Sequence, residues 1–145
     1  MKEMNIVLAR EYKVVVVATF DITGNAVTQE EADAITELFI TELVSTGKVS
    51  VLGRMEFDKI IKDMNFQASD LSDSSKTVML GEALNAQLIS RGKIIRLGNK
   101  LYLFSSIIDA KNAKVVSSVR EEFNSLDDIF GRLGNFVMNL VVGLR

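Results

Sequence analysis

The chain of 145 residues contains no cysteine, histidine, proline or tryptophan. Without cysteine there is no disulfide, zinc–thiolate site or thiol nucleophile. Without histidine, the commonest general base and the commonest metal ligand in proteins are both missing. The longest apolar run, VVVVATF, has seven residues and is closed by Asp21, so it is too short to span a bilayer. These absences exclude several classes of enzyme, and the chain shows no targeting signal.

The composition that remains is typical of one soluble globular domain. Hydrophobic residues make up 48% and charged residues 25% of the chain. A domain of this length buries roughly two-thirds of its unfolded surface, so a full core forms without disulfides or metals. The net charge of −2 argues against a general nucleic-acid binder, because neutralising phosphates requires a basic surface. We predict an N-terminal extension at residues 1–12 and a single α/β domain at residues 13–145.

The first half of the domain follows a strand–helix–strand pattern. Residues 13–20, KVVVVATF, are mostly apolar at both odd and even positions, as in a central strand that is covered on both faces. Thr28 and Glu31 have the spacing of a capping box, which predicts a helix start, and Gly47 predicts its end. A short strand at residues 49–52 follows. Two strands joined by one helix in this way predict a parallel pair.

The second half predicts more helices and then a run of antiparallel strands. The polar segment 65–75 is expected to be the main loop, and paired turn signals separate the later strands. The expected elements are helices at 54–64 and 76–84, strands between 87 and 122 with turns at 98–99 and 109–114, and a final amphipathic helix from Ser125. The predicted fold is therefore a mixed four- or five-stranded sheet with helices on both faces and a C-terminal amphipathic helix.

No residue set in the sequence has a catalytic, cofactor-binding or metal-binding pattern. The segment STGKVS suggests a phosphate-binding loop at Gly47, but that motif requires glycine where Glu42 stands and places its glycine before a helix. Solvation and helix capping explain four carboxylates that would otherwise suggest a metal: Asp70, Asp73, Asp127 and Asp128. We therefore expect no catalytic residue, no cofactor and no metal.

A cluster of basic residues surrounds the first hairpin: Arg91, Lys93, Arg96 and Lys100. A basic ribbon of this kind suits nucleic acid, anionic lipid or an acidic partner, although Tyr102 and Phe104 on the next strand are the only aromatic residues placed to stack on bases. Basic side chains on sheet faces and edges also discourage unwanted strand pairing, and the overall acidic charge favours this second interpretation. Both interpretations are kept as hypotheses.

The segments ELVSTGKVSVLGR and LGEALNAQLISRG, with the hairpins and final helix in this order, resemble one bacterial envelope family. It is the domain shared by the curli-secretion lipoprotein and the lipoprotein activators of penicillin-binding proteins, and the amino-terminal domain of TolB is a more distant look-alike. The first segment is similar to the family's helix end, short strand and Arg. The second resembles its Leu-Gly pair and strand glycine, and Asp109 stands where the family has Asp before a Thr-Gly turn. The resemblance covers about residues 13–142.

Two departures from the family concern the backbone. Asn85 replaces a glycine at the join between a helix and a strand, and Asn112 replaces a glycine in the second hairpin. Because asparagine tolerates positive φ better than other non-glycine residues, we expect both positions to hold that conformation. The join at Asn85 is then structural. The family's lipid-bearing cysteine is expected upstream, so membrane attachment is implied only through an anchor outside this chain.

The resemblance implies a non-enzymatic domain of the cell envelope, periplasmic or associated with the outer membrane. Such a domain supports assembly, secretion or regulation of an envelope enzyme through a protein partner. Within it, Phe66 and Leu71 in the 65–75 segment are predicted to be apolar anchors for that partner. One alternative is a cytosolic module that binds a small ligand or nucleic acid through the basic hairpin. Another is a self-assembling subunit, a homo-oligomer like the family's ring-forming secretion protein.

Overall fold

The computed structural model describes residues 13–144, and the expected N-terminal extension, residues 1–12, lies outside this range. In chain order the elements are β1 (Lys13–Val17), β2 (Asp21–Thr23), α2 (Gln29–Ser45), β3 (Val49–Val51), α3 (Arg54–Asp63), the 3₁₀ helix η1 (Ala68–Ser72), α4 (Ser74–Leu84), β4 (Leu88–Leu97), β5 (Lys100–Asp109), β6 (Lys114–Phe123) and α5 (Leu126–Val142). The α/β class and the C-terminal helix are confirmed. None of the helices between residues 13 and 144 is long and apolar enough to cross a membrane.

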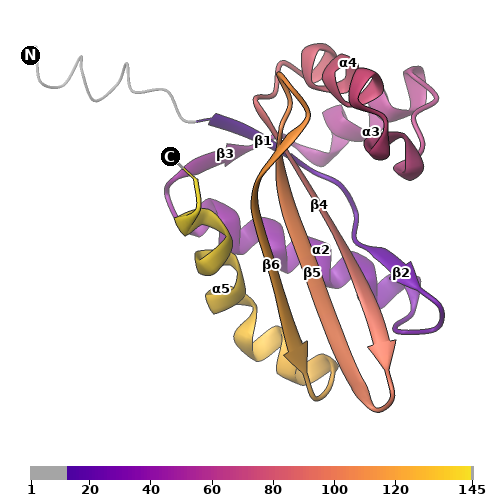
Figure 1. Ribbon diagram of the computed structural model, residues 1–145, viewed down its shortest axis with the longest axis vertical. Helices are drawn as coiled ribbons and strands as arrows, with labels where there is room; N and C mark the ends of the chain where they lie inside the picture. The colour runs from indigo at the N-terminus through magenta and orange to yellow at the C-terminus, as the bar shows by residue number, and fades with distance from the viewer. Residues whose placement is uncertain (1–12, 145) are drawn as a thin grey trace, which may run out of the picture.

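The sheet is mixed and has six strands in the order β3-β1-β4-β5-β6, with the short β2 paired to β4 (Figure 1). β1 pairs in parallel with both β3 and β4, which confirms the predicted parallel pair. β4, β5 and β6 form two successive antiparallel pairs of long strands. The sheet exceeds the expected four or five strands because β2, which follows the predicted strand 13–20 where a turn was expected, adds a short strand beside β4; β1 itself ends at Val17.

Helices cover the two faces of the sheet unequally. The larger core lies between the sheet and the α2–α5 layer, where Phe39, Phe123 and Phe136 are fully buried. A smaller core on the opposite face contains Ile89 and Ile108 under α3, η1 and α4. In Figure 1, α3 and α4 lie together at one end of the sheet, and the long lower parts of β4, β5 and β6 extend past them. Part of one sheet face is therefore left without a helix.

Local signals place the helix ends as predicted. The Thr28 hydroxyl accepts a hydrogen bond from the Glu31 amide at 3.1 Å, and the Glu31 carboxylate accepts from the Thr28 amide at 2.9 Å. This reciprocal pair satisfies two otherwise free amide groups and confirms the capping box. Gly47, just past α2, has φ +69°, as expected for a helix-ending glycine.

The join between α4 and β4 is a tight structural turn, as predicted. Asn85 has φ 51° and ψ 42°, the left-handed conformation, and the next amide, of Ala86, donates to the Gly81 carbonyl at 2.9 Å. Gly81 is also needed here because a Cβ at this position would clash with Ala110 of the second hairpin. The prediction for Asn112 was wrong: the positive φ in that hairpin, +60°, falls one residue later at Ala113.

The segment 65–75 is more ordered than the expected loop, because it contains η1 and the start of α4. Asp70 accepts a hydrogen bond from the Gln67 amide at 2.8 Å and closes η1 at its start. Asp73 accepts from the Lys76 amide at 3.1 Å and caps α4. The polar residues that suggested a loop are thus helix caps.

Candidate interaction surface

The uncovered part of β4–β6, here called the open sheet face, is the main surface of the molecule without a helical layer. Side chains alternate along β5: Leu101, Leu103 and Ile107 are buried against α2 and α5, and Tyr102 and Phe104 point to the opposite side. By cross-strand register, the open sheet face consists of Arg91, Lys93, Ile95, Tyr102, Phe104, Ser106, Ser118, Arg120 and Glu122. It therefore combines half-buried aromatic rings with polar and charged side chains.

Three cations gather around Phe104 on this face. Lys93 is its direct neighbour on β4 and holds its ammonium 5.5 Å from the ring centre. Arg120 is its direct neighbour on β6, and Arg91 lies two residues before Lys93. A shallow hollow of about 250 Å³ lies here, lined by Arg91, Lys93 and Phe104 together with Ser106 and the acidic Asp21. This arrangement favours an anionic or carboxylate-bearing surface.

The lower part of the same face carries a hydrogen-bonded tyrosine. The Tyr102 hydroxyl donates to the Glu122 carboxylate at 2.6 Å, and this bond raises the pKa of the tyrosine above its ordinary value of 10. Two carboxylates border the cations: Asp21 of β2 is the cross-strand neighbour of Lys93 and lines the same hollow, and Glu122 stands opposite Tyr102. None of the three cations forms an ion pair within 4 Å with another residue in the described part of the chain.

The basic cluster predicted from the sequence is divided by the structure. Arg91 and Lys93 reach the open sheet face, whereas Arg96 is on the opposite side and donates to the Ala26 carbonyl at 3.3 Å. Lys100 donates to the Asn124 side chain near the far end of the hairpin. Arg120 takes their place from β6. Sequence spacing did not show this residue, because its position depends on the register of two hairpins.

The predicted anchors, Phe66 and Leu71, lie beside this face under the α3–α4 layer. Both are half-buried, both pack against the smaller core, and both line an apolar cavity of about 180 Å³. Phe57 and Ile89 form the floor of this cavity, and Asp21 lines both the cavity and the hollow on the open sheet face. The anchors and the cations thus border one continuous surface, and whether Phe66 and Leu71 bind a partner remains a prediction.

Arg54, the first residue of α3, contacts the end of β1. Its guanidinium donates to the Val17 carbonyl and, at 2.8 Å, to the Thr19 hydroxyl, and it lies 4.9 Å above the Phe57 ring. These contacts satisfy the backbone where β1 ends and fasten the start of α3 to it. The arginine that the resemblance points to therefore fastens the start of α3 to the end of β1, which is a structural task.

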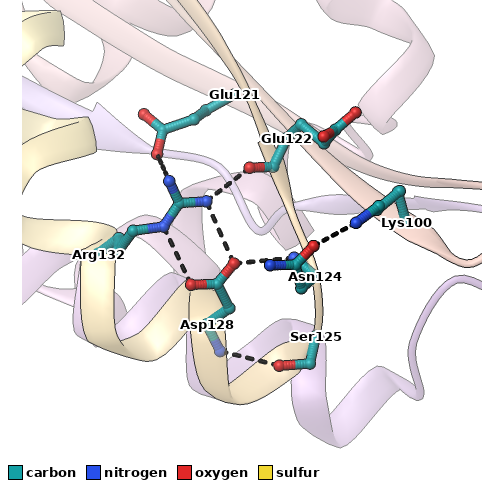
Figure 2. Close-up of polar contacts among 7 residues, drawn as sticks. All are labelled: Lys100, Glu121, Glu122, Asn124, Ser125, Asp128 and Arg132. Carbon is teal, nitrogen blue, oxygen red and sulfur yellow. Dashed lines mark hydrogen bonds and ion pairs between the residues drawn. The ribbon is translucent and has the colours of Figure 1, made fainter.

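A second cluster of charges, at the start of α5, is also structural (Figure 2). Arg132 pairs with Asp128 at 3.0 Å and with Glu121 at 3.1 Å, and it donates to the Glu122 carbonyl at 2.6 Å. Asp128 accepts from the Asn124 amide at 2.8 Å, and its own amide donates to the Ser125 hydroxyl at 3.1 Å. These bonds fasten α5 to β6 and confirm the predicted helix cap.

The charges of this cluster are matched within the chain. The hydrogen bond from the Asn124 amide, with the nearby Arg132, holds the pKa of Asp128 below its ordinary value. The pKa of the Asp70 carboxyl is lowered in the same way, by a hydrogen bond from the Gln67 amide and by the ion pair with Lys76 at 3.0 Å. In the part of the chain that the structure describes, no group of three or more carboxylates gathers as metal ligands.

Comparison with known proteins places the fold. No family model matches the chain, and no curated protein matches its sequence. The C-terminal domain of LpoB from Escherichia coli matches with a TM-score of 0.64 and 14% identity, over 86% of this chain and 94% of that domain. The fold is that of the LpoB C-terminal domain.

Other solved structures share it. The lipoprotein GNA1162 from Neisseria meningitidis matches with a TM-score of 0.67 and 14% identity, over 90% of this chain and 96% of the other. PelC from Paraburkholderia phytofirmans, solved as a dodecamer, matches with a TM-score of 0.57 and 13% identity, over 92% of this chain and 88% of the other. TolB from Acinetobacter baumannii matches with a TM-score of 0.52 and 11% identity, and the match covers 29% of the TolB chain. The family resemblance is thus confirmed at the level of the fold.

Proposed function

We propose that this chain is a non-enzymatic protein-interaction domain of the bacterial cell envelope. It supports assembly, secretion or regulation of an envelope enzyme by binding a protein partner in the periplasm or at the outer membrane. The observation that carries this proposal is the shared fold, which spans most of this chain and nearly the whole of the LpoB domain and of the lipoprotein GNA1162. GNA1162 is a lipoprotein, and the open side of the present domain is suited to contacts.

The partner contacts the chain at the cavity that Phe66 and Leu71 line. An apolar cavity at the surface gives a partner's apolar side chain a place to be desolvated, and such central pockets carry most of the energy of an interface. The neighbouring cations on the open sheet face favour a partner whose surface is acidic around that side chain. Apolar anchoring with charge around it is the usual arrangement of a specific interface.

Site-directed photocrosslinking in cells tests this contact. A photoreactive residue at Ser72, an exposed position in η1 next to Leu71, is compared with one at Asn139, an exposed position on α5. The proposal predicts a discrete crosslinked envelope protein from position 72 and none from position 139. Equal labelling from both positions, or only cytosolic products, would contradict it.

Substitution of the anchors then separates binding from stability. Phe66→Ala and Leu71→Ala should weaken the affinity for the crosslinked partner by about tenfold or more, as expected for anchor residues. Because both side chains also pack against the smaller core, the matched control is Ile60→Ala, a half-buried residue of the same core that does not line this cavity. The control should cost similar stability and leave affinity unchanged. Equal loss of affinity in all three would assign Phe66 and Leu71 to the core alone.

A second candidate function rests on the open sheet face. Arg91, Lys93 and Arg120 around Phe104 suit a small anionic ligand or single-stranded nucleic acid in a cytosolic module. Retention on heparin or single-stranded DNA that falls steeply as salt rises, together with a cytosolic location, would favour this function over the first.

A further inference from the structure

The apolar cavity under α3 and α4 lies where ligands commonly bind in α/β sheets. β1 and β3 are parallel neighbours, but β1 leads into α2 on one face of the sheet and β3 leads into α3 on the other (Figure 1). The chain thus separates at the carboxyl ends of these strands, and such a separation leaves a crevice for a ligand. Thr19, which follows β1, and Phe57 of α3 line the cavity at this place.

The size and walls of the cavity suit one large apolar side chain. Its volume is about 180 Å³, and about 150 Å³ of apolar space is enough to hold benzene. Most of its wall is apolar and includes Phe57, Ile61 and Leu80. The Thr19 hydroxyl on the wall already accepts a hydrogen bond from Arg54 at 2.8 Å. A ring or a branched alkyl group therefore leaves water on entering the cavity, which favours its binding.

Asp21 lies where this cavity meets the hollow on the open sheet face, since it lines both. Among the described residues that line the cavity, it alone is charged. Lys93 is its cross-strand neighbour, but the Lys93 ammonium lies over the Phe104 ring, and the two charges form no ion pair within 4 Å. An exposed carboxylate beside an apolar cavity favours a ligand whose apolar group is next to an ammonium.

The hollow adds a place for a negative charge. Arg91 and Lys93 line it, and neither is in an ion pair within 4 Å with another described residue. The hydroxyls of Ser106 and Ser118, which also line it, are bonded to each other at 3.0 Å. Across this surface the order is therefore an apolar cavity, one carboxylate and then two cations. An α-amino acid offers the complementary groups on one carbon atom: a side chain, an ammonium and a carboxylate.

We propose that the cavity and the hollow together bind a free α-amino acid with a large apolar side chain, such as phenylalanine. The side chain enters the cavity, the ammonium pairs with Asp21, and the carboxylate pairs with Lys93 and Arg91. This site goes beyond the proposed function, because it gives the cavity a small ligand as well as a protein partner. Since both use the same cavity, the amino acid and the partner's side chain exclude each other.

Titration of the purified chain with phenylalanine and three analogues tests each contact without any substitution. NMR follows the methyl signals of Ile61, Leu71 and Ile89, which line the cavity. Phenethylamine lacks the carboxylate, 3-phenylpropionate lacks the ammonium, and alanine lacks the ring. Phenylalanine should shift these signals and bind about threefold more tightly than either compound that lacks one charge, as for one exposed ion pair. It should bind about tenfold or more tightly than alanine, which buries no ring.

Variants assign the two charges. Asp21→Asn should weaken phenylalanine binding about threefold and remove the preference over 3-phenylpropionate. Lys93→Gln should weaken phenylalanine binding and leave phenethylamine binding unchanged. The matched controls, Asp63→Asn and Lys62→Gln, alter exposed charges of α3 that line neither the cavity nor the hollow, so they should leave binding unchanged. Thermal melts show that each variant is folded.

Three results would overturn the proposal: no shift of the cavity signals up to the solubility of phenylalanine, equal binding of phenylalanine and a compound that lacks one charge, or unchanged binding in Asp21→Asn. Equal binding of N-acetylphenylalanine amide, which has the ring and neither charge, would also overturn it and assign the cavity to a partner's side chain. The titration uses the purified chain alone, so its failure leaves the proposed envelope function standing. A missing crosslink from position 72 likewise leaves the amino-acid site standing.

Discussion

Replacing Ala113 by glycine should stabilise the protein, although it removes a methyl group. Ala113 lies in the turn between β5 and β6 with φ +60°, where a Cβ clashes with the following carbonyl oxygen. That clash costs roughly 1–2 kcal/mol, and the greater freedom of glycine in the unfolded chain offsets about 0.4–1 kcal/mol of the gain. The hydrogen bond from the Ala113 amide to the Asp109 carbonyl, at 2.7 Å, is unchanged by the substitution. We therefore expect a net gain of about 0.7 kcal/mol.

Equilibrium unfolding in urea, with the same slope for both proteins, measures this gain, and the melting temperature should rise by roughly 3 °C. The matched control is Ala34→Gly at an exposed position within α2, where the same chemical change should cost about 1 kcal/mol. A loss of stability in Ala113→Gly similar to that of the control would refute the reasoning, because it would mean that this turn does not hold positive φ in solution.

Two further predictions concern the core and the dependence on pH. Gly92→Ala should cost about 3 kcal/mol in the free energy of unfolding, since the added Cβ would overlap the Phe20 ring and lie 2.8 Å from a backbone oxygen; a neutral result would show that β4 is not packed this closely. The folded pKa of Asp128 is lowered by the Asn124 amide and by Arg132, so its contribution is present above its ordinary pKa of 3.8 and is lost as the pH falls below that value. In Asp128→Asn, urea unfolding at a series of pH values should show a weaker loss of stability in acid, and an unchanged acid dependence would contradict this assignment.

The sequence predicted the features that depend on a few neighbouring residues. The capping box at Thr28 and the cap at Ser125 could be read because each is complete within four residues. The left-handed turn at Asn85 was predicted from the family resemblance, which has glycine at this join, and from the tolerance of asparagine for positive φ. Alternation and turn signals were enough to identify the α/β class and the long antiparallel strands.

Features that depend on register were missed. The positive φ was expected at Asn112 and occurs at Ala113, because the Asn112 side chain instead accepts a hydrogen bond from the Lys114 amide at 3.0 Å and closes the turn one residue later. The pairing of β5 with β6 also contains an irregularity at Ile107 and Ile108, which no local pattern signals.

The candidate surface was predicted only in part. Its proposed anchors, Phe66 and Leu71, were identified as apolar residues in a polar segment, but their packing on the smaller core depends on the fold of η1. Arg120 was not associated with Arg91 and Lys93, since they meet only across β5. That the lower half of the sheet face is uncovered follows from the short lengths of α3 and α4, and sequence periodicity does not report which part of a sheet a helix covers.

The most direct test of the central claim is fractionation of cells that express the full native open reading frame, with intact-mass analysis of the product. The account predicts a processed or lipidated protein in the envelope fraction. An unprocessed protein found only in the cytosol would contradict it.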